Sequence, residues 1–300
     1  MKYVKLISFL TMLAVCLSLL AGCGKGKSNE ALQGSGSGDE SQNVFEQMQN
    51  IAESNSAKPV GGYETPAEGD FLWEELDNGV AITSYSGSAT AIQIPDQLGG
   101  KPVCAIGEEA FTQRELTGVK IPDSVTIIGV KAFCYCTALK EVQLGSGVKT
   151  IDREAFEGCL ALTDVKLNDG LEMIGDSAFG TTPSLTAITI PNTVTLLDAG
   201  AFVLSGLEEI TVPGSVQTIG EQAFSTCENL KRAVLEEGVV SVAFKAFEDC
   251  QKLEVVELPA SATELEEMIF VYTDGVTIHA PAGSAAEAYA RENELAFQAS

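Results

Sequence analysis

Cysteine is the residue type in this chain whose number and spacing most directly raise the question of chemistry. The 300 residues include eight cysteines, and four of them each follow a phenylalanine by three positions. Thiols at a fixed spacing could hold zinc, form disulfides or act as nucleophiles. Zinc is disfavoured because the sequence contains no Cys-x-x-Cys pair, and we expect no metal site. The four regularly spaced residues are Cys136, Cys159, Cys227 and Cys250.

The oxidation state of these thiols leaves two alternatives open. If successive coils of the chain stack, Cys136 and Cys159, or Cys227 and Cys250, have Cα atoms about 5 Å apart, which is close enough for a disulfide. Their Cβ bonds then run parallel, and this geometry suits a disulfide poorly. Buried free thiols that pack as small hydrophobic groups are the favoured interpretation.

Other catalytic arrangements have little support in the sequence. The chain has one histidine, His279, and no nucleophile motif accompanies it. Acidic doublets such as Glu74-Glu75 recur, but adjacent residues of a strand point to opposite faces and do not form a glycosidase pair by themselves. The sequence has neither a phosphate-binding loop nor an EF-hand loop. We therefore expect a protein that is not an enzyme and uses no cofactor.

The elements that position these residues are copies of one repeat. The dipeptide Ala-Phe recurs seven times at intervals of 22 or 23 residues. A period of this length is typical of a solenoid, in which each coil packs on its neighbours. We expect a β-rich solenoid with a parallel sheet, short helical turns at Ala-Phe and a cap at each end. The repeated phenylalanines are Phe111, Phe133, Phe156, Phe179, Phe202, Phe224 and Phe247.

Each repeat also contains a predicted strand with the pattern L-x-x-V-x-[IL], of which Leu139–Leu144 is a complete example. Apolar residues alternate with polar ones, as in a strand that is buried on one face. The third and fifth residues point outward and form a surface that we call the polar strip. Because the strip is expected to be continuous, rigid and long, we expect it to be the contact surface, with simple solvation as the alternative. Its members are Glu141, Gln143, Asp164, Lys166, Thr189, Glu209, Thr211, Arg232 and Glu257.

The two ends of the repeat region carry sequence signals for caps. Two apolar runs flank Asp77-Asn78-Gly79, which predicts a β-hairpin within an N-terminal cap at 70–94. In this cap Trp73 would cover the first coil. The repeats then occupy 95–270. Ser284 to Glu287 forms a capping box, which predicts a helix within a C-terminal cap at 271–300.

Residues 1–22 have the features of an export signal. Lys2 and Lys5 precede an uncharged apolar run from Leu6 to Leu20, which is short for a membrane-spanning helix. The run ends at Leu20-Ala21-Gly22-Cys23, which looks like the lipobox of bacterial lipoproteins. That resemblance implies a diacylglyceryl group on the thiol of Cys23, cleavage before this residue, and an anchor of the mature protein in the membrane.

The segment at 23–69 is predicted to be a flexible acidic tether between the lipid and the solenoid. It contains a Gly-Ser-Gly-Ser-Gly run at 34–38, a composition typical of flexible linkers. Apolar residues within 43–54 share one helical face, which indicates a transient helix.

The repeat as a whole resembles a known family. Ile121-Pro122 is followed by Val125, Ile128-Gly129 and Ala132-Phe133, and this alternation resembles the BspA-like leucine-rich repeats of bacterial surface proteins. The resemblance covers about residues 70 to 300, and the chain departs from ordinary leucine-rich repeats in lacking an Asn ladder. It implies a leucine-rich-repeat solenoid at the cell surface, in a family implicated in adhesion to matrix proteins or to other cells.

The net charge narrows the class of partner. The chain carries 42 acidic and 18 basic residues, for a formal charge of −24, and such a surface disfavours nucleic acid. We therefore expect an exported, lipid-anchored surface protein whose solenoid binds an extracellular protein or glycan. A passive spacer without a specific ligand, and an unrecognised hydrolase, are the alternatives.

Overall fold

The computed structural model describes residues 47–54 and 60–300. The predicted export signal, Cys23 and most of the predicted tether lie outside these residues. Within the described ranges, no helix is both long and apolar enough to cross a bilayer.

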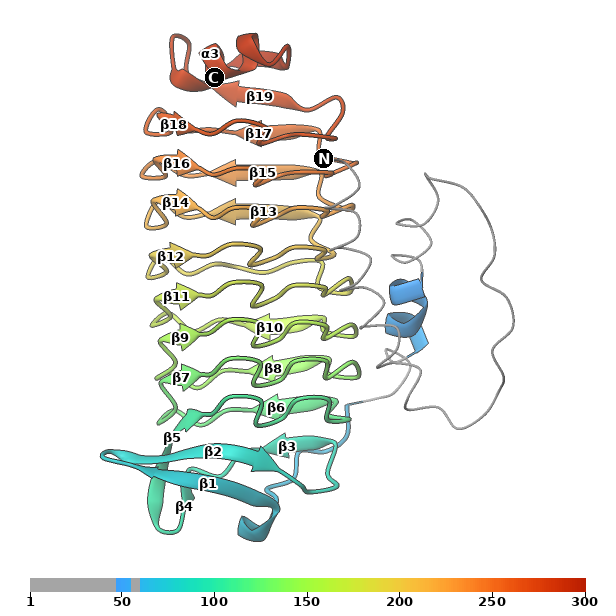
Figure 1. Ribbon diagram of the computed structural model, residues 1–300, viewed down its shortest axis with the longest axis vertical. Helices are drawn as coiled ribbons and strands as arrows, with labels where there is room; N and C mark the ends of the chain where they lie inside the picture. The colour runs from blue at the N-terminus through green and yellow to red at the C-terminus, as the bar shows by residue number, and fades with distance from the viewer. Residues whose placement is uncertain (1–46, 55–59) are drawn as a thin grey trace, which may run out of the picture. The chain divides into compact units, whose positions relative to one another are not determined.

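Residues from 60 onward form the predicted solenoid, a stack of coils with strands along its sides (Figure 1). One wall is a sheet that we call the long ladder. Apart from the antiparallel pairs β1–β2 and β4–β5, its neighbouring strands run parallel. Its 11 strands are β1 (Phe71–Leu76), β2 (Gly79–Tyr85), β4 (Gln97–Leu98), β5 (Lys101–Ile106), β7 (Ile127–Ile128), β9 (Thr150–Ile151), β11 (Met173–Ile174), β12 (Leu196–Leu197), β14 (Thr218–Ile219), β16 (Ser241–Val242) and β18 (Glu264–Leu265).

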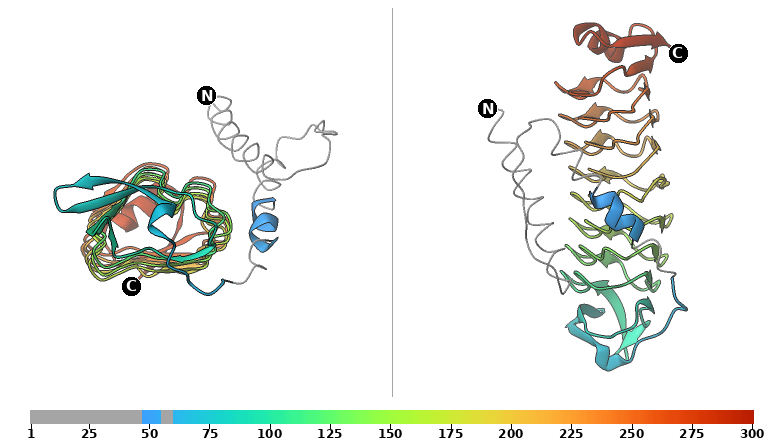
Figure 2. Two further views of the ribbon diagram at one scale, coloured as in Figure 1. Left: turned by 90° about the horizontal axis from the view of Figure 1, so that it is seen from below. Right: turned by 90° about the vertical axis from the view of Figure 1, so that its right-hand side faces the viewer.

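The opposite wall holds the predicted L-x-x-V-x-[IL] strands, in two parallel sheets (Figure 2). The first half-ladder contains β3 (Ala91–Gln93), β6 (Gly118–Lys120), β8 (Glu141–Gln143) and β10 (Asp164–Lys166). The second half-ladder contains β13 (Glu209–Val212), β15 (Arg232–Leu235), β17 (Val255–Glu257), β19 (Thr277–Ala280) and β20 (Ala296–Ala299).

A column of aromatic rings fills the interior between the walls. From Phe111 to Phe270, each ring stacks on the next with centroids 4.9–5.7 Å apart. Tyr85 stacks on Phe111 at one end, and Tyr289 meets Phe270 edge-on at the other. The predicted buried column is thus confirmed, and Phe270 belongs to it even though its local sequence departs from the repeat.

The segments that carry Ala-Phe are hydrogen-bonded turns. The amide of Ala132 donates to Gly129 O in its own turn, whereas the amide of Phe133 donates to Ala155 O of the next coil. Bonds within the turn alternate along the segment with bonds to the next coil. The segment therefore forms a turn and also links two adjacent coils. The alanine of each pair is buried, as expected where a turn packs closely on the core.

The predicted thiol column is buried and its cysteines are free. Each Sγ donates to the carbonyl oxygen of the phenylalanine in the preceding coil, for example Cys136 to Phe111 at 3.0 Å and Cys250 to Phe224 at 3.1 Å. In the last coil the hydroxyl of Thr273 takes the same role, at 2.7 Å from Phe247 O. The cysteines therefore act as small buried donors to backbone carbonyls.

Both predicted caps are present. The strands β1 and β2 form the hairpin, and Trp73 packs against the core with part of its side chain exposed. At the other end, helix α3 (Ala285–Glu292) begins after Ser284, whose hydroxyl accepts a hydrogen bond from the amide of Glu287. The sequence did not predict β20, which pairs with β19 and so covers the edge of the half-ladder.

The predicted boundary between tether and cap differs from the structure. Glu64 already pairs with Ile92 of β3 through two backbone hydrogen bonds, before the 3-10 helix at Glu68–Asp70. Residues 47–54 are helical, and Met48 and Ala52 are buried in a small cluster with Leu160. Part of the segment predicted to be a flexible tether is thus packed on the repeats.

Candidate functional site: the polar strip

The polar strip consists of two parallel columns of outward side chains. Register pairs Glu141 with Asp164 in the first column, and Gln143 with Lys166 in the second. In the second half-ladder, Glu209 lies beside Arg232, and Val234 beside Glu257. Because partners in a parallel sheet stand about 4.8 Å apart, these side chains form continuous rows within each half-ladder.

The exposure of the strip residues agrees with their predicted orientation. Glu141 and Glu257 are half-buried, and every other member of the predicted strip is exposed. By contrast, Val142 and Val165, which lie between strip positions on their strands, are buried. The alternation predicted from the sequence therefore places all nine residues on the outer face.

The prediction that the strip is continuous is wrong. Residues 186–190 form no strand, so β10 and β13 are the facing edges of two separate half-ladders. Ile188 occupies the sequence position of Val165 and Ile210, yet it is only partly buried while both of those are buried. Ile188 still packs against the core, but less deeply than its counterparts, and the residues around it do not continue the ladder. Thr189 remains exposed within this interruption.

Shallow hollows lie along this face, among them one over the first half-ladder and one at the interruption. The larger, of about 700 Å³, lies over the outward residues of β8 and β10, and Ser146, Asn168 and Asp169 complete its wall. The smaller, of about 330 Å³, lies at the interruption itself, where Ile188 and Asn192 meet Thr211. The sequence analysis missed Asn168 and Asn192 because both come after the strand segment that defined the strip.

The N-terminal end of the strip is covered by the chain itself. The amino group of Lys120 lies 4.2 Å from the centroid of the Tyr63 ring, a cation–π geometry. Burial, followed by the nearby charge of Glu141, raises the pKa of the Tyr63 hydroxyl. Gly118 occupies the outward position beneath this hydroxyl, where a Cβ would lie 2.8 Å from the oxygen. Glycine at 118 thus makes room for Tyr63, which no repeat pattern indicates.

Ion pairs on the surface are arranged between coils. Arg232 pairs with Glu257 within the strip. Beside it, Lys231 and Glu208 lie 2.8 Å apart, and their hydrogen bond lowers the pKa of the Glu208 carboxyl. Exposed pairs of this kind contribute little to stability, so the charged residues of the strip can be substituted without a large effect on the fold.

The lone histidine is placed as a strand residue. His279 lies on β19 beside Glu257 of β17, in the second column of the face. It is half-buried. Nothing in its register brings it to a cysteine of the column, since those thiols point into the core.

Comparisons with known proteins bear directly on this repeat. The model of the family described as "BspA type Leucine rich repeat region" matches this chain at residues 104–231 and 197–285, with six copies of the repeat region. The chain belongs to this family. Solenoids of this type are typically interaction or scaffold modules that do not catalyse reactions. Among curated proteins, no significant match was found.

Several solved structures resemble this BspA-type protein. A leucine-rich repeat protein of T. pallidum is 30% identical, with 63% of this chain and 91% of that chain covered and a TM-score of 0.59. A leucine-rich repeat protein of Bacteroides ovatus shares the fold with a TM-score of 0.53. It is 21% identical, and the match covers 73% of this chain and 71% of that chain. A leucine rich cell surface protein of Faecalibacterium prausnitzii is 26% identical, and the match covers 73% of this chain and 77% of that chain with a TM-score of 0.48.

Proposed function

We propose that this BspA-type protein is a lipid-anchored protein of the cell surface whose polar strip binds an extracellular protein or glycan. The observation that carries the proposal is the pair of half-ladders, which hold exposed charged and polar side chains in fixed rows around two hollows. A rigid surface loses little conformational freedom on binding, and this favours affinity.

The composition of the strip favours a polar partner. Acidic Glu141 and Asp164 form one row, and Lys166 stands in the next row, so the first half-ladder offers both signs of charge within a few ångströms. Side chains of this kind recognise hydrogen-bonding and charged groups of proteins and glycans, and their complementarity sets specificity and association rate more than affinity.

Binding of the purified chain to a panel of immobilised extracellular-matrix proteins and to a glycan array tests this function. The proposal predicts saturable binding to at least one member of the panel, because family members are implicated in adhesion. A passive spacer would bind none of them, and that result would contradict the proposal.

The anchor rests on the sequence signal at Cys23 and has its own test. Metabolic labelling with a fatty-acid analogue should modify the wild-type protein, and Cys23→Ser should lose the label and release the protein to the medium. Cys104→Ser, at a buried thiol of the N-terminal region, is the matched control that keeps the label. Equal labelling of the Cys23 variant would refute the assignment.

A further inference from the structure

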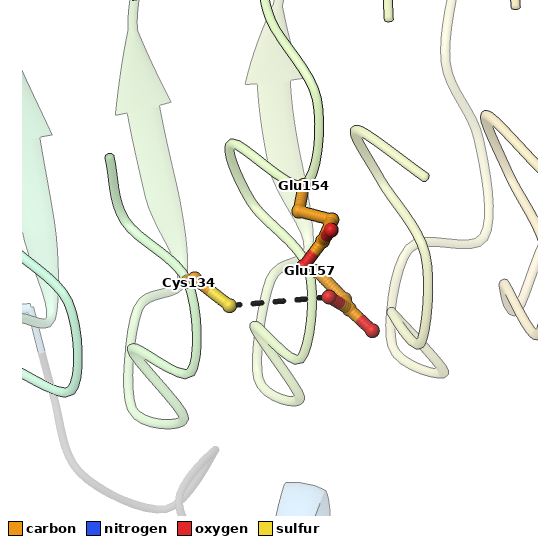
Figure 3. A group of neighbouring side chains, drawn as sticks. All are labelled: Cys134, Glu154 and Glu157. Carbon is orange, nitrogen blue, oxygen red and sulfur yellow. Dashed lines mark hydrogen bonds between the residues drawn. The ribbon is translucent and has the colours of Figure 1, made fainter. Parts of the chain in front are cut away.

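A cluster of buried side chains lies between two adjacent coils, outside the polar strip. The binding function proposed for the strip does not use these side chains. Cys134 comes from one coil, and Glu154 and Glu157 come from the next, with one ligand atom of each within 4.8 Å of the others (Figure 3). The thiol of Cys134 lies 4.0 Å from Glu157 Oε2. Cys134 is 2% exposed and Glu157 4% exposed, so both are almost fully removed from water.

The repeat supplies an internal comparison for this cluster. Glu157 follows Phe156 directly, and Glu248 follows Phe247 in the same way. Two positions before each phenylalanine stand Glu154 in the first case and Lys245 in the second. The same backbone site thus holds a like-charged pair in one coil and an oppositely charged pair in the other.

Glu248 is fully compensated by its neighbours. Lys245 forms an ion pair with it, and both side chains are 13% exposed. The side-chain amide of Gln222 donates a hydrogen bond of 3.0 Å to Glu248 Oε2, and the hydroxyl of Ser225 lies 3.5 Å from the same oxygen. A buried carboxylate is stable in such a setting because a cation and hydrogen-bond donors replace the lost water.

Glu157 forms no direct ion pair with any described residue, although its carboxyl is hydrogen-bonded to Glu154 and Lys131 stands near enough to interact with it electrostatically. Among the ion pairs of the described residues, Lys131 and Arg153 both contact Glu154, at 3.2 Å and 3.4 Å, and none contacts Glu157. Its neighbour in the preceding coil is the Cys134 thiol, in the position where Ser225 serves Glu248. A buried carboxylate beside a second carboxylate favours a bound proton or a bound metal ion.

We propose that Cys134, Glu154 and Glu157 bind a divalent transition-metal ion, with Zn²⁺ as the best match to one sulfur and two oxygen ligands. Zinc accepts mixed sulfur and carboxylate ligands in tetrahedral sites. The hard ions Ca²⁺ and Mg²⁺ prefer oxygen ligands and would make no use of the Cys134 thiol. The absence of a Cys-x-x-Cys motif does not exclude the site, because its ligands come from two coils that stack.

The distances fit such an ion after a small contraction. Zn–S and Zn–O bonds of about 2.3 Å and 2.1 Å at a tetrahedral angle place sulfur and oxygen about 3.6 Å apart. The thiol of Cys134 and Glu157 Oε2 are 4.0 Å apart, and the ligand atoms of all three residues lie within 4.8 Å of one another. Side-chain rotations that shorten these separations by up to about 1 Å would bring the three atoms to the ion. The side chain of Glu154 is 21% exposed, which opens a path from solvent.

Thiol and carboxyl ligands must lose any bound proton before they bind Zn²⁺, so binding at this cluster would release protons to solvent. Lys131 stays on Glu154 and orients that carboxylate.

Isothermal titration of the purified full chain with Zn²⁺ tests the site. Wild type should bind Zn²⁺ with a site that Cys134→Ser and Glu157→Gln each weaken at least about tenfold, since even the loss of an outer-shell partner has an effect of that size. Cys104→Ser and Glu248→Gln are the matched controls, at another buried thiol and at the repeat-equivalent carboxylate. Both controls should keep the wild-type affinity.

Thermal unfolding separates loss of the site from loss of the fold. In chelator, every variant should unfold cooperatively, and Zn²⁺ should raise the Tm of wild type and both controls but not of the two site variants. Should Cys134→Ser fail to fold, Glu154→Gln replaces it at a partly exposed position. Equal Zn²⁺ affinity in wild type and site variants, or a cluster that takes up protons and no Zn²⁺, would overturn the proposal.

Discussion

The rings of Phe133 and Phe156 lie one above the other, with centroids 5.2 Å apart and planes within 3° of parallel. Each ring belongs to a different coil, and the same relationship continues to Phe179, at 5.4 Å. Since the coils meet through these rings, the column couples the stability of each repeat to that of its neighbours.

Removal of one ring from the middle of the column should have a large effect on stability. Phe156→Ala is expected to lower the free energy of unfolding by about 3–5 kcal/mol, because it removes buried surface and leaves a cavity between two coils. Thr189→Ala, at an exposed position, should change it by less than about 0.5 kcal/mol. Chemical denaturation measures both values, and similar small effects for the two variants would contradict the buried column.

The thiol column gives a prediction about hydrogen bonding in the core. Thr273 shows that a hydroxyl can donate to the phenylalanine carbonyl of the preceding coil. Cys250→Thr keeps a hydrogen-bond donor at this position. Cys250→Val gives a side chain of the same shape as threonine but leaves the carbonyl oxygen of Phe224 without the donor. The threonine variant should therefore be more stable by about 1 kcal/mol, as measured by chemical denaturation. A valine variant of equal or greater stability would show that packing alone explains the column.

Acid titration offers a test at Asp249. Burial raises the pKa of its carboxyl, an effect that the hydrogen bond from Gln251 opposes and the charge of Glu248 increases. The folded state therefore holds a proton that the unfolded chain has already released, so this group's contribution to stability is present at low pH and is lost as pH rises through the folded pKa. Asn at this site keeps the left-handed backbone, with φ of 54° in the wild type.

The comparison of Asp249→Asn with wild type isolates this group. The Tm values should agree most closely below the ordinary aspartate pKa of about 3.9, and the variant should become the more stable protein as pH rises above it. Glu208→Gln is the control of opposite sign, because the ion pair with Lys231 lowers the pKa of that carboxyl. A Tm difference at Asp249 that does not change with pH would contradict the assigned cause.

The features that follow a strict period could be predicted from sequence. Phe, Ala and Cys recur at positions that must stack, so their burial follows from the repeat alone. The hairpin, whose turn lies at Asp77-Asn78, and the cap at Ser284 could be predicted from local chemistry, because a turn and a helix start depend on few residues.

Features that depend on contacts between coils could not be predicted in this way. The long ladder is made of strands as short as Ile127–Ile128, too brief for an alternating pattern to reveal. Residues 185–190 keep the L-x-x-V-x-[IL] pattern of apolar positions and yet 186–190 form no strand, and the contact of Tyr63 depends on the space above Gly118. The pairing of Cys134 with Glu157 likewise appears only once successive coils are stacked in register.

Whether the polar strip is the contact face can be decided by measuring the affinity of strip variants for a partner from the matrix or glycan panel. The double charge reversal Asp164→Lys with Lys166→Glu alters the first half-ladder, and Lys149→Glu with Glu172→Lys reverses an exposed ion pair at 2.8 Å beside the long ladder. Both variants should unfold like wild type, since exposed charges contribute little to stability.

Surface plasmon resonance against that partner then gives the answer. We expect the strip reversal to weaken binding at least about tenfold, equivalent to about 1.4 kcal/mol, and the reversal beside the long ladder to leave the affinity at the wild-type value. Equal affinity for all three proteins, or a loss only in the variant beside the long ladder, would contradict the proposed role of the strip.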